Sequence, residues 1–149
     1  MENEILEFLI SFGGLFFVLA FVHLVADWVF QSESMAKRKH KDLLVRLKHC
    51  LSYCFWFLLI FIILKLNWWI IIVLTLILLV SHFMLDTYKP AIWWLKYVRN
   101  PNDIKNYKGK NSEYYLESYI QNNKWLLIMA DQIFHLFFIA IIVFIIGAL

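Results

Sequence analysis

Residues 68–88 read WWIIIVLTLILLVSHFMLDTY, an apolar run that ends in a histidine and an aspartate. A helix needs about 20 largely apolar residues to cross the hydrocarbon core of a bilayer, and this run supplies them. Three further apolar runs of similar length occupy residues 5–30, 43–66 and 125–149. The sequence therefore predicts four membrane-spanning helices.

The composition agrees with a membrane protein. Of the 149 residues, 62% are hydrophobic and 19% are aromatic, whereas a soluble domain is usually about 45–50% apolar. A chain of this length has room for one domain. We therefore predict an all-α fold, an integral membrane four-helix bundle that forms a single transmembrane domain over residues 1–149.

Three connections of different character join the spans. Residues 31–42 are polar and basic, and residues 65–67 leave room only for a tight turn, so the second and third helices should form a hairpin. Residues 89–124 mix aromatic side chains with Lys and Arg, a composition typical of the membrane–water interface. We predict a cytoplasmic interfacial loop with helical parts there. Its predicted elements are short surface helices near 91–99 and 112–122 and a loop over 100–110.

The distribution of basic residues predicts the orientation of the chain. Residues 31–48 contain six of the 14 Lys and Arg residues, and residues 89–124 contain seven. Both segments lie on the same side of a four-helix topology, and the positive-inside rule assigns that side to the cytoplasm. We therefore expect a multi-pass protein of the cell inner (plasma) membrane with both termini outside. Its basic surface should contact anionic membrane lipid, and no nucleic-acid partner is predicted, because topology already explains the basic residues.

Histidine and aspartate recur four residues apart near the cytoplasmic end of three spans. The pairs are His23 and Asp27, His82 and Asp86, and Asp131 and His135. Positions four apart share one face of a helix, and a charged side chain facing lipid near the bilayer centre costs at least about 2.5–3.5 kcal/mol. The three faces should therefore point inward and meet, together with His49 of the second span.

Such a cluster of imidazoles and carboxylates suits a divalent metal such as zinc, manganese or iron. A bound cation would also neutralise carboxylates that otherwise repel one another. The predicted metal ligands are His23, Asp27, His49, His82, Asp86, Asp131 and His135, with His23, His82, Asp86 and His135 as the best candidates. Asp27 and Asp131 are the predicted catalytic residues, as bridging ligand or general base. Gln31 and Gln132 are expected to orient ligands or substrate, and Arg46 can hold an anionic group such as phosphate.

Other interpretations of these residues stay open. Hydrogen bonds between His, Asp and Gln side chains can simply hold membrane helices together. Histidine and aspartate relays also serve metal-ion or proton transporters and sensors, and so short a chain can be a structural subunit of a membrane complex or a homo-oligomer. Apart from Glu7 and Lys65 at the span ends, the outer halves of the spans lack ionisable residues, which favours a one-sided pocket over a path through the membrane. His40, in the basic run that begins at Lys37, is interpreted as a solvated interface residue.

Four stretches together carry a resemblance to a known family. They are HLVADWVFQSESMAKRKHKD (23–42), LKH (47–49), SHFMLD (81–86) and ADQIFH (130–135). The sequence resembles the membrane family called domain of unknown function 3307, in which His-x-x-x-Asp-aromatic-x-x-Gln, a His, His-x-x-x-Asp and Asp-Gln-x-x-His follow one another on the four helices. More loosely, it is similar to inner-membrane metal-dependent hydrolases in architecture and in its use of His and Asp. These likenesses support the site without naming a reaction.

The function expected from these observations is that of a metal-dependent hydrolase at the cytoplasmic membrane face. A lipid or a phosphate ester is the expected substrate class, since the pocket should open at the membrane surface. The transporter or sensor and the structural subunit are the alternatives.

Overall fold

The computed structural model describes residues 2–99 and 112–148, and these residues form helices joined by short connections. Four helical segments are long and apolar enough to cross a membrane. They are α1 (Glu2–Leu24) with a π-helical turn (Val25–Val29), α3 (Leu43–Ile63), α4 (Trp68–Leu85) and α8 (Lys124–Gly147). The predicted all-α, four-helix membrane fold is confirmed.

The shorter elements lie in the connections. They are α2 (Glu33–Arg38), α5 (Lys89–Trp94), a second π-helical turn (Leu95–Arg99) and α7 (Ser112–Asn122). The two surface helices expected in the long connection therefore occur, whereas the loop predicted over 100–110 lies outside the described residues. The basic segment 31–42 was predicted only as a connection, but it contains α2. Ser32 caps this helix, because its hydroxyl accepts a hydrogen bond from the backbone N–H of Met35 at 3.2 Å.

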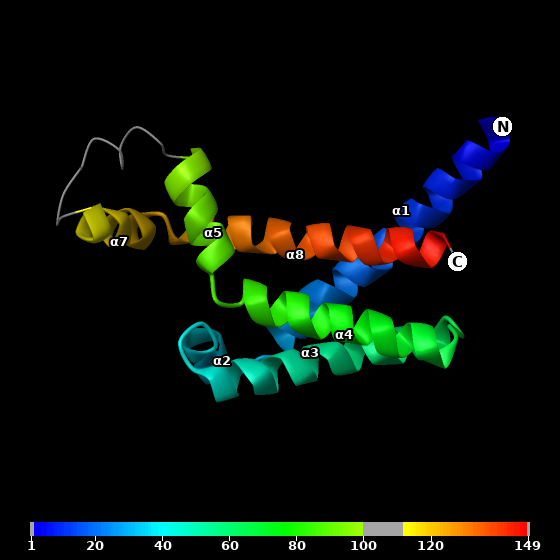
Figure 1. Ribbon diagram of the computed structural model, residues 1–149, viewed down its shortest axis with the longest axis horizontal. Helices are drawn as coiled ribbons and strands as arrows, with labels where there is room; N and C mark the ends of the chain where they lie inside the picture. The colour runs from blue at the N-terminus through cyan, green and yellow to red at the C-terminus, as the bar shows by residue number, and fades with distance from the viewer. Residues whose placement is uncertain (1, 100–111, 149) are drawn as a thin grey trace.

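The spans are arranged so that the molecule has two unlike ends. Figure 1 shows α1 crossing the other three spans obliquely, with the start of α1 and the end of α8 at one end of the bundle. The elements α2, α5 and α7 lie at the opposite end, which we call the polar end. The turn between α3 and α4 lies at the same end as the termini, so these two helices form the predicted hairpin. Lys65 in that turn has a left-handed backbone with φ 55°.

The half of the bundle away from the polar end is packed with apolar side chains. Phe57 and Phe61 of α3, Leu74 of α4, and Ile139 and Ile142 of α8 are almost completely buried in one cluster. Many large apolar side chains are exposed on the outside of the spans, as expected of surfaces that face lipid. A second, smaller apolar cluster joins α5 to the first turns of α8. It anchors the interfacial helix beside the polar residues of α8.

Candidate metal site

All four spans contribute polar side chains to one cluster near the polar end. The end of α1 supplies His23 and its π-helical turn supplies Asp27, the second turn of α3 supplies His49, and α4 supplies His82. The remaining members are Asp86, Asp131, Gln132 and His135. Each of these side chains is at most 8% exposed. The sequence prediction that the His and Asp residues meet inside the bundle is confirmed.

Helix ends and a widened turn place two of the carboxylates. Asp27 lies in the π-helical turn that follows α1, and such turns are frequent at functional sites. Asp86 is the residue at which α4 ends, and its backbone N–H donates to the carbonyls of His82 and Met84. Both carboxylates are thereby held at the point where a span gives way to a connection, at the edge of the bilayer-spanning region.

Four of the side chains form what we call the first group: Asp27, His49, His82 and Asp86. One potential ligand atom from each lies within 4.8 Å of the others. The Nε2 atom of His49 is 3.0 Å from Asp27 Oδ1, 3.3 Å from Asp86 Oδ2 and 3.0 Å from His82 Nε2. Nitrogen and carboxylate oxygen atoms that converge at such distances are the donor set of a zinc, manganese or iron site.

Lys39 also reaches this cluster, which the sequence did not reveal. Its Nζ atom lies 2.7 Å from Asp27 Oδ1, 3.0 Å from Asp86 Oδ1 and 3.1 Å from His49 Nε2. The residue is only 3% exposed. The ammonium group therefore lies among the ligand atoms of the first group. Burial disfavours the charged form of Lys39, but the Asp86 and Asp27 carboxylates outweigh it and raise the pKa of this lysine above its usual value.

The α2–α3 connection is shaped to deliver this lysine. Lys39 follows the last residue of α2, and its backbone carbonyl accepts a hydrogen bond from the Arg46 guanidinium at 3.3 Å. A second hydrogen bond from Arg46 reaches the carbonyl of His40 at 3.4 Å. Arg46 also packs its guanidinium over the ring of Phe83, 4.6 Å from the centroid. Arg46, predicted to bind an anionic group, thus holds the backbone beside Lys39 in this structure.

His23 belongs to a hydrogen-bond network that orients the carboxylates. Its Nδ1 lies 3.1 Å from the Tyr53 hydroxyl and its Nε2 lies 2.9 Å from Gln132 Oε1. Gln132 in turn donates from Nε2 to Asp27 Oδ2 at 3.1 Å and to Asp131 Oδ2 at 3.5 Å. Both ring nitrogens of His23 are therefore engaged by neutral partners. Gln132, predicted to orient ligands or substrate, bridges two carboxylates through its amide.

Three side chains form what we call the second group: Asp86, Asp131 and His135. Their ligand atoms also lie within 4.8 Å of one another. His135 Nε2 is 3.9 Å from Asp86 Oδ1, and its Nδ1 is 2.9 Å from the backbone carbonyl oxygen of Asp131. Asp86 belongs to both groups, so the two groups adjoin at one carboxylate.

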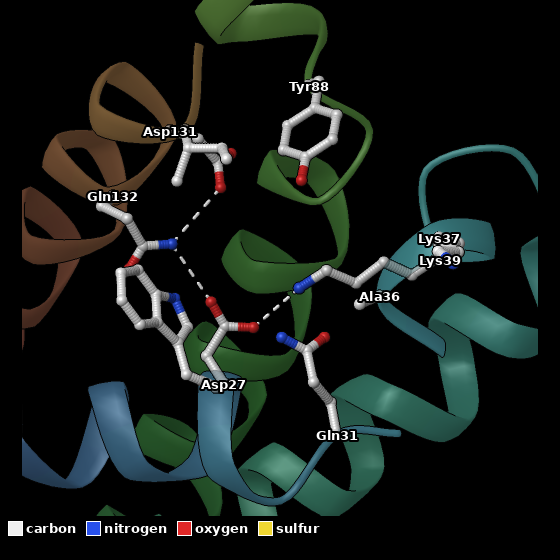
Figure 2. A pocket seen from close by; sticks show the side chains of 10 residues that line it. Asp27, Gln31, Ala36, Lys37, Lys39, Tyr88, Asp131 and Gln132 are labelled. Carbon is white, nitrogen blue, oxygen red and sulfur yellow. Dashed lines mark hydrogen bonds and ion pairs between the residues drawn. The ribbon is translucent and has the colours of Figure 1, made fainter. Parts of the chain in front are cut away.

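A pocket of about 490 Å³ reaches the cluster from the polar end. Its wall combines residues of two spans, α8 and the π-helical turn that follows α1, with residues of α2 and of the connections. The lining residues are Asp27, Trp28, Gln31, Ala36, Lys37, Lys39, Tyr88, Ile128, Asp131 and Gln132. Figure 2 shows Asp27, Asp131 and Gln132 on one side, with the side chains of Lys39 and Gln31 approaching from the other. Asp27 and Asp131 thus belong both to the ligand groups and to the pocket wall.

Two further side chains of the pocket are placed for contact with a bound molecule. The side-chain oxygen of Gln31 is buried and has no hydrogen-bond partner among the described residues. Tyr88 directs its hydroxyl into the pocket (Figure 2), and its backbone is left-handed with φ 58°. Burial and the nearby Asp131 carboxylate raise the pKa of Tyr88, so its hydroxyl stays protonated and can donate.

One protein family matches most of the chain. The family model described as "Protein of unknown function (DUF3307)" matches residues 15–149. The chain belongs to this family. The match includes every member of both ligand groups, and the resemblance seen in the sequence motifs is confirmed. No curated protein and no solved structure matches the chain.

In this DUF3307 chain the sequence predicted the His and Asp residues of the cluster but not Lys39 and Tyr53, which also contact it. Lys39 stands in a run of similar basic residues, and nothing in the run distinguishes the buried one. Tyr53 lies within an apolar stretch of α3, although its ring stacks on His82 with centroids 3.7 Å apart. One signal was present for Lys39: buried carboxylates require a cation, and a basic run adjoins the cluster in sequence. His40, predicted to be solvated, is half-buried with its ring beside Tyr88.

Proposed function

We propose that this protein is a metal-dependent hydrolase that cleaves an ester of a membrane lipid at the cytoplasmic membrane face. One observation carries the proposal: the pocket that opens at the polar end contains Asp27 and Asp131, which also belong to groups able to hold a metal. A site buried on one side and open on the other can receive a substrate and return the products to the same side.

The chemistry of the donor set supports a metal. The cluster offers imidazole nitrogens and carboxylate oxygens, which suit zinc, manganese or iron. When bound with an open position, such an ion lowers the pKa of a coordinated water molecule to about 7. Asp27 and Asp131 would divide two further roles, one as a ligand and the other as the acceptor of the proton that water loses.

The proposed reaction needs only water as its second reactant. The water oxygen forms a bond to the phosphorus or acyl carbon of the ester, and the bond from that atom to the leaving oxygen breaks. One proton from water goes to the carboxylate and then to the alcohol that leaves. Tyr88 is positioned in the pocket to donate a hydrogen bond to the ester group, and the unpartnered oxygen of Gln31 can accept one from a hydroxyl of the substrate.

The walls of the pocket favour a lipid as the substrate. Trp28 and Ile128 line it and are 55% and 42% exposed, respectively. Both lie in spans, so an acyl chain in the adjacent leaflet can contact them without leaving the bilayer. The polar part of the same lipid would lie near Lys37 at the other side of the pocket. The orientation follows from the positive-inside rule, because α2 and its basic run lie at the polar end.

The apolar half of the bundle argues against a transport path. Beyond the His and Asp cluster, the buried side chains of the spans include Phe57, Phe61 and Ile142. A cation passing through this region would lose its hydration without gaining ligands, which is very costly. The described residues therefore support chemistry at one face more than passage between the two faces.

The test is an assay of the purified protein with mixed lipid vesicles and added Zn²⁺ or Mn²⁺. We expect release of phosphate or fatty acid by the wild type, reduced at least about 100-fold in Asp27→Asn or Asp131→Asn, the scale expected when an acid–base group is lost. Glu33→Gln is the matched control, because Glu33 is an exposed carboxylate outside this pocket. Metal uptake by proteoliposomes without any release of lipid products would contradict the hydrolase and favour a transporter.

A further inference from the structure

The charges inside the cluster do not balance among the protein's own groups. Asp27, Asp86 and Asp131 place three carboxylates within the bundle, and Lys39 supplies one ammonium in contact with two of them. Arg46, another buried cation, makes no ion pair with these carboxylates among the described residues, since its guanidinium binds backbone carbonyls. With the imidazoles neutral, two negative charges remain. One divalent cation would neutralise them.

In the first group the Lys39 ammonium occupies the position that a metal ion would take. Its Nζ lies at hydrogen-bond distance from Asp27, Asp86 and His49, three of the four members. A metal bonded to the same atoms at about 2.0–2.2 Å would overlap the ammonium and repel it. The first group can therefore hold the ammonium or a metal ion, but not both.

The second group presents a free ligand atom. His135 Nδ1 lies 2.9 Å from the carbonyl oxygen of Asp131, which can only accept, so Nδ1 carries the proton. The lone pair of the neutral ring is then on Nε2. This Nε2 is buried and has no hydrogen-bond partner in the part of the chain that the structure describes. A metal-binding histidine typically donates its other N–H to a carbonyl or carboxylate in this way.

We propose that the protein binds one divalent cation per chain, held by Asp86, Asp131 and His135, and that the Lys39 ammonium replaces a second metal in the adjoining first group. This inference deepens the proposed function and rests on it. Asp86 lies between the Lys39 ammonium and the proposed cation. Its Oδ1 is 3.0 Å from Lys39 Nζ and 3.9 Å from His135 Nε2, which would bind that cation.

The ligand atoms of the second group lie within 4.8 Å of one another, close to the spacing that one ion requires. Two ligands at about 2.0–2.2 Å from a metal can lie at most about 4.4 Å apart, and the His135 and Asp86 atoms are within that limit. Three protein ligands leave a coordination position open, and Asp131 extends the site to the pocket wall. Asp27 does not belong to this group, so it is the carboxylate left to accept a proton.

The first experiment measures the metal content of purified protein after incubation with Zn²⁺ or with Mn²⁺. We expect one equivalent in the wild type and two in Lys39→Met, which has a similar length and no charge and so frees the first group for a second ion. Two equivalents in the wild type, or one in Lys39→Met, would overturn the inference while leaving a metal-dependent function intact. No binding at all would overturn both.

A pair of matched histidine variants keeps the test decisive if Lys39→Met does not fold. His135→Asn should lose the single ion, whereas His49→Asn, altered only in the first group, should keep it. The reverse pattern would move the metal to the first group and contradict the inference. Because both variants are read by metal content, the result does not depend on finding the lipid substrate.

Discussion

The two halves of the bundle are built from the same four spans but are held together by different forces. In the apolar half, Phe57, Phe61 and Ile142 fill the space between helices. Such contacts in a bilayer gain packing energy rather than a hydrophobic driving force, because lipid is equally apolar. In the polar half the buried charged groups need partners, because burying a charge without one is costly. The arrangement of the helices therefore depends on side-chain packing in the apolar half and on the pairing of charges in the polar half.

The sharpest test of the comparison concerns which side of the membrane each half faces. Single cysteines at Glu33, near the polar end, and at Lys65, in the turn at the other end, should respond oppositely to an impermeant thiol reagent. On intact cells Lys65→Cys should be labelled and Glu33→Cys should not, and inverted vesicles should reverse the result. The native Cys50 and Cys54 are buried and provide the unlabelled background. Labelling of Glu33→Cys on intact cells would reverse the proposed orientation.

The next largest effect is expected in the apolar half. Phe57→Ala should lower the free energy of unfolding by about 3–5 kcal/mol, because it leaves a cavity among fully buried neighbours. The loss should be the same with Zn²⁺ present or removed by a chelator, as measured by thermal unfolding in detergent. Phe55→Ala, an exposed site on the same helix, is the control and should change little. A loss at Phe57 that depends on metal would show that the two halves are coupled.

The smallest effect is expected where the two halves meet. Tyr53→Phe keeps the ring stacked on His82 but removes the hydrogen bond to His23. Hydrogen bonds between membrane helices are worth about 0.6 kcal/mol on average, so thermal unfolding should shift only slightly. Tyr97→Phe, at an exposed residue, should show no shift. A loss of several kcal/mol in Tyr53→Phe would mean that the polar network, rather than packing, supports this level of the bundle.

Much of the fold could be predicted because the bilayer imposes strong rules on sequence. Span length and apolar composition predicted four helices, and the three-residue connection at 65–67 predicted the hairpin. The spacing of His82 and Asp86 placed them on one helix face, and His82 Nε2 lies 3.4 Å from Asp86 Oδ2. The spacing of ionisable residues predicts their location well in spans, because a charged side chain there is costly unless it faces the interior of the bundle.

The rest could not be predicted because it depends on departures from regular structure. The π-helical turn Val25–Val29 interrupts the regular spacing between His23 and Asp27, so His23 meets Tyr53 while Asp27 meets Lys39. Composition could not show that α2 turns one lysine of a basic run inward. The sequence also suggested a metal as the neutraliser of the carboxylates, whereas Lys39 supplies part of that charge.

The position of Lys39 has a consequence for how the protein is assembled during synthesis. Its ammonium contacts Asp27 and His49, which are close in sequence, and Asp86, which is made later. Gln132, the donor to the other oxygen of Asp27, is made later still. We therefore expect the nascent chain to hold a partly satisfied acidic cluster until α8 has entered the bilayer. A chain truncated before α8 would therefore leave the second oxygen of Asp27 without its hydrogen bond from Gln132.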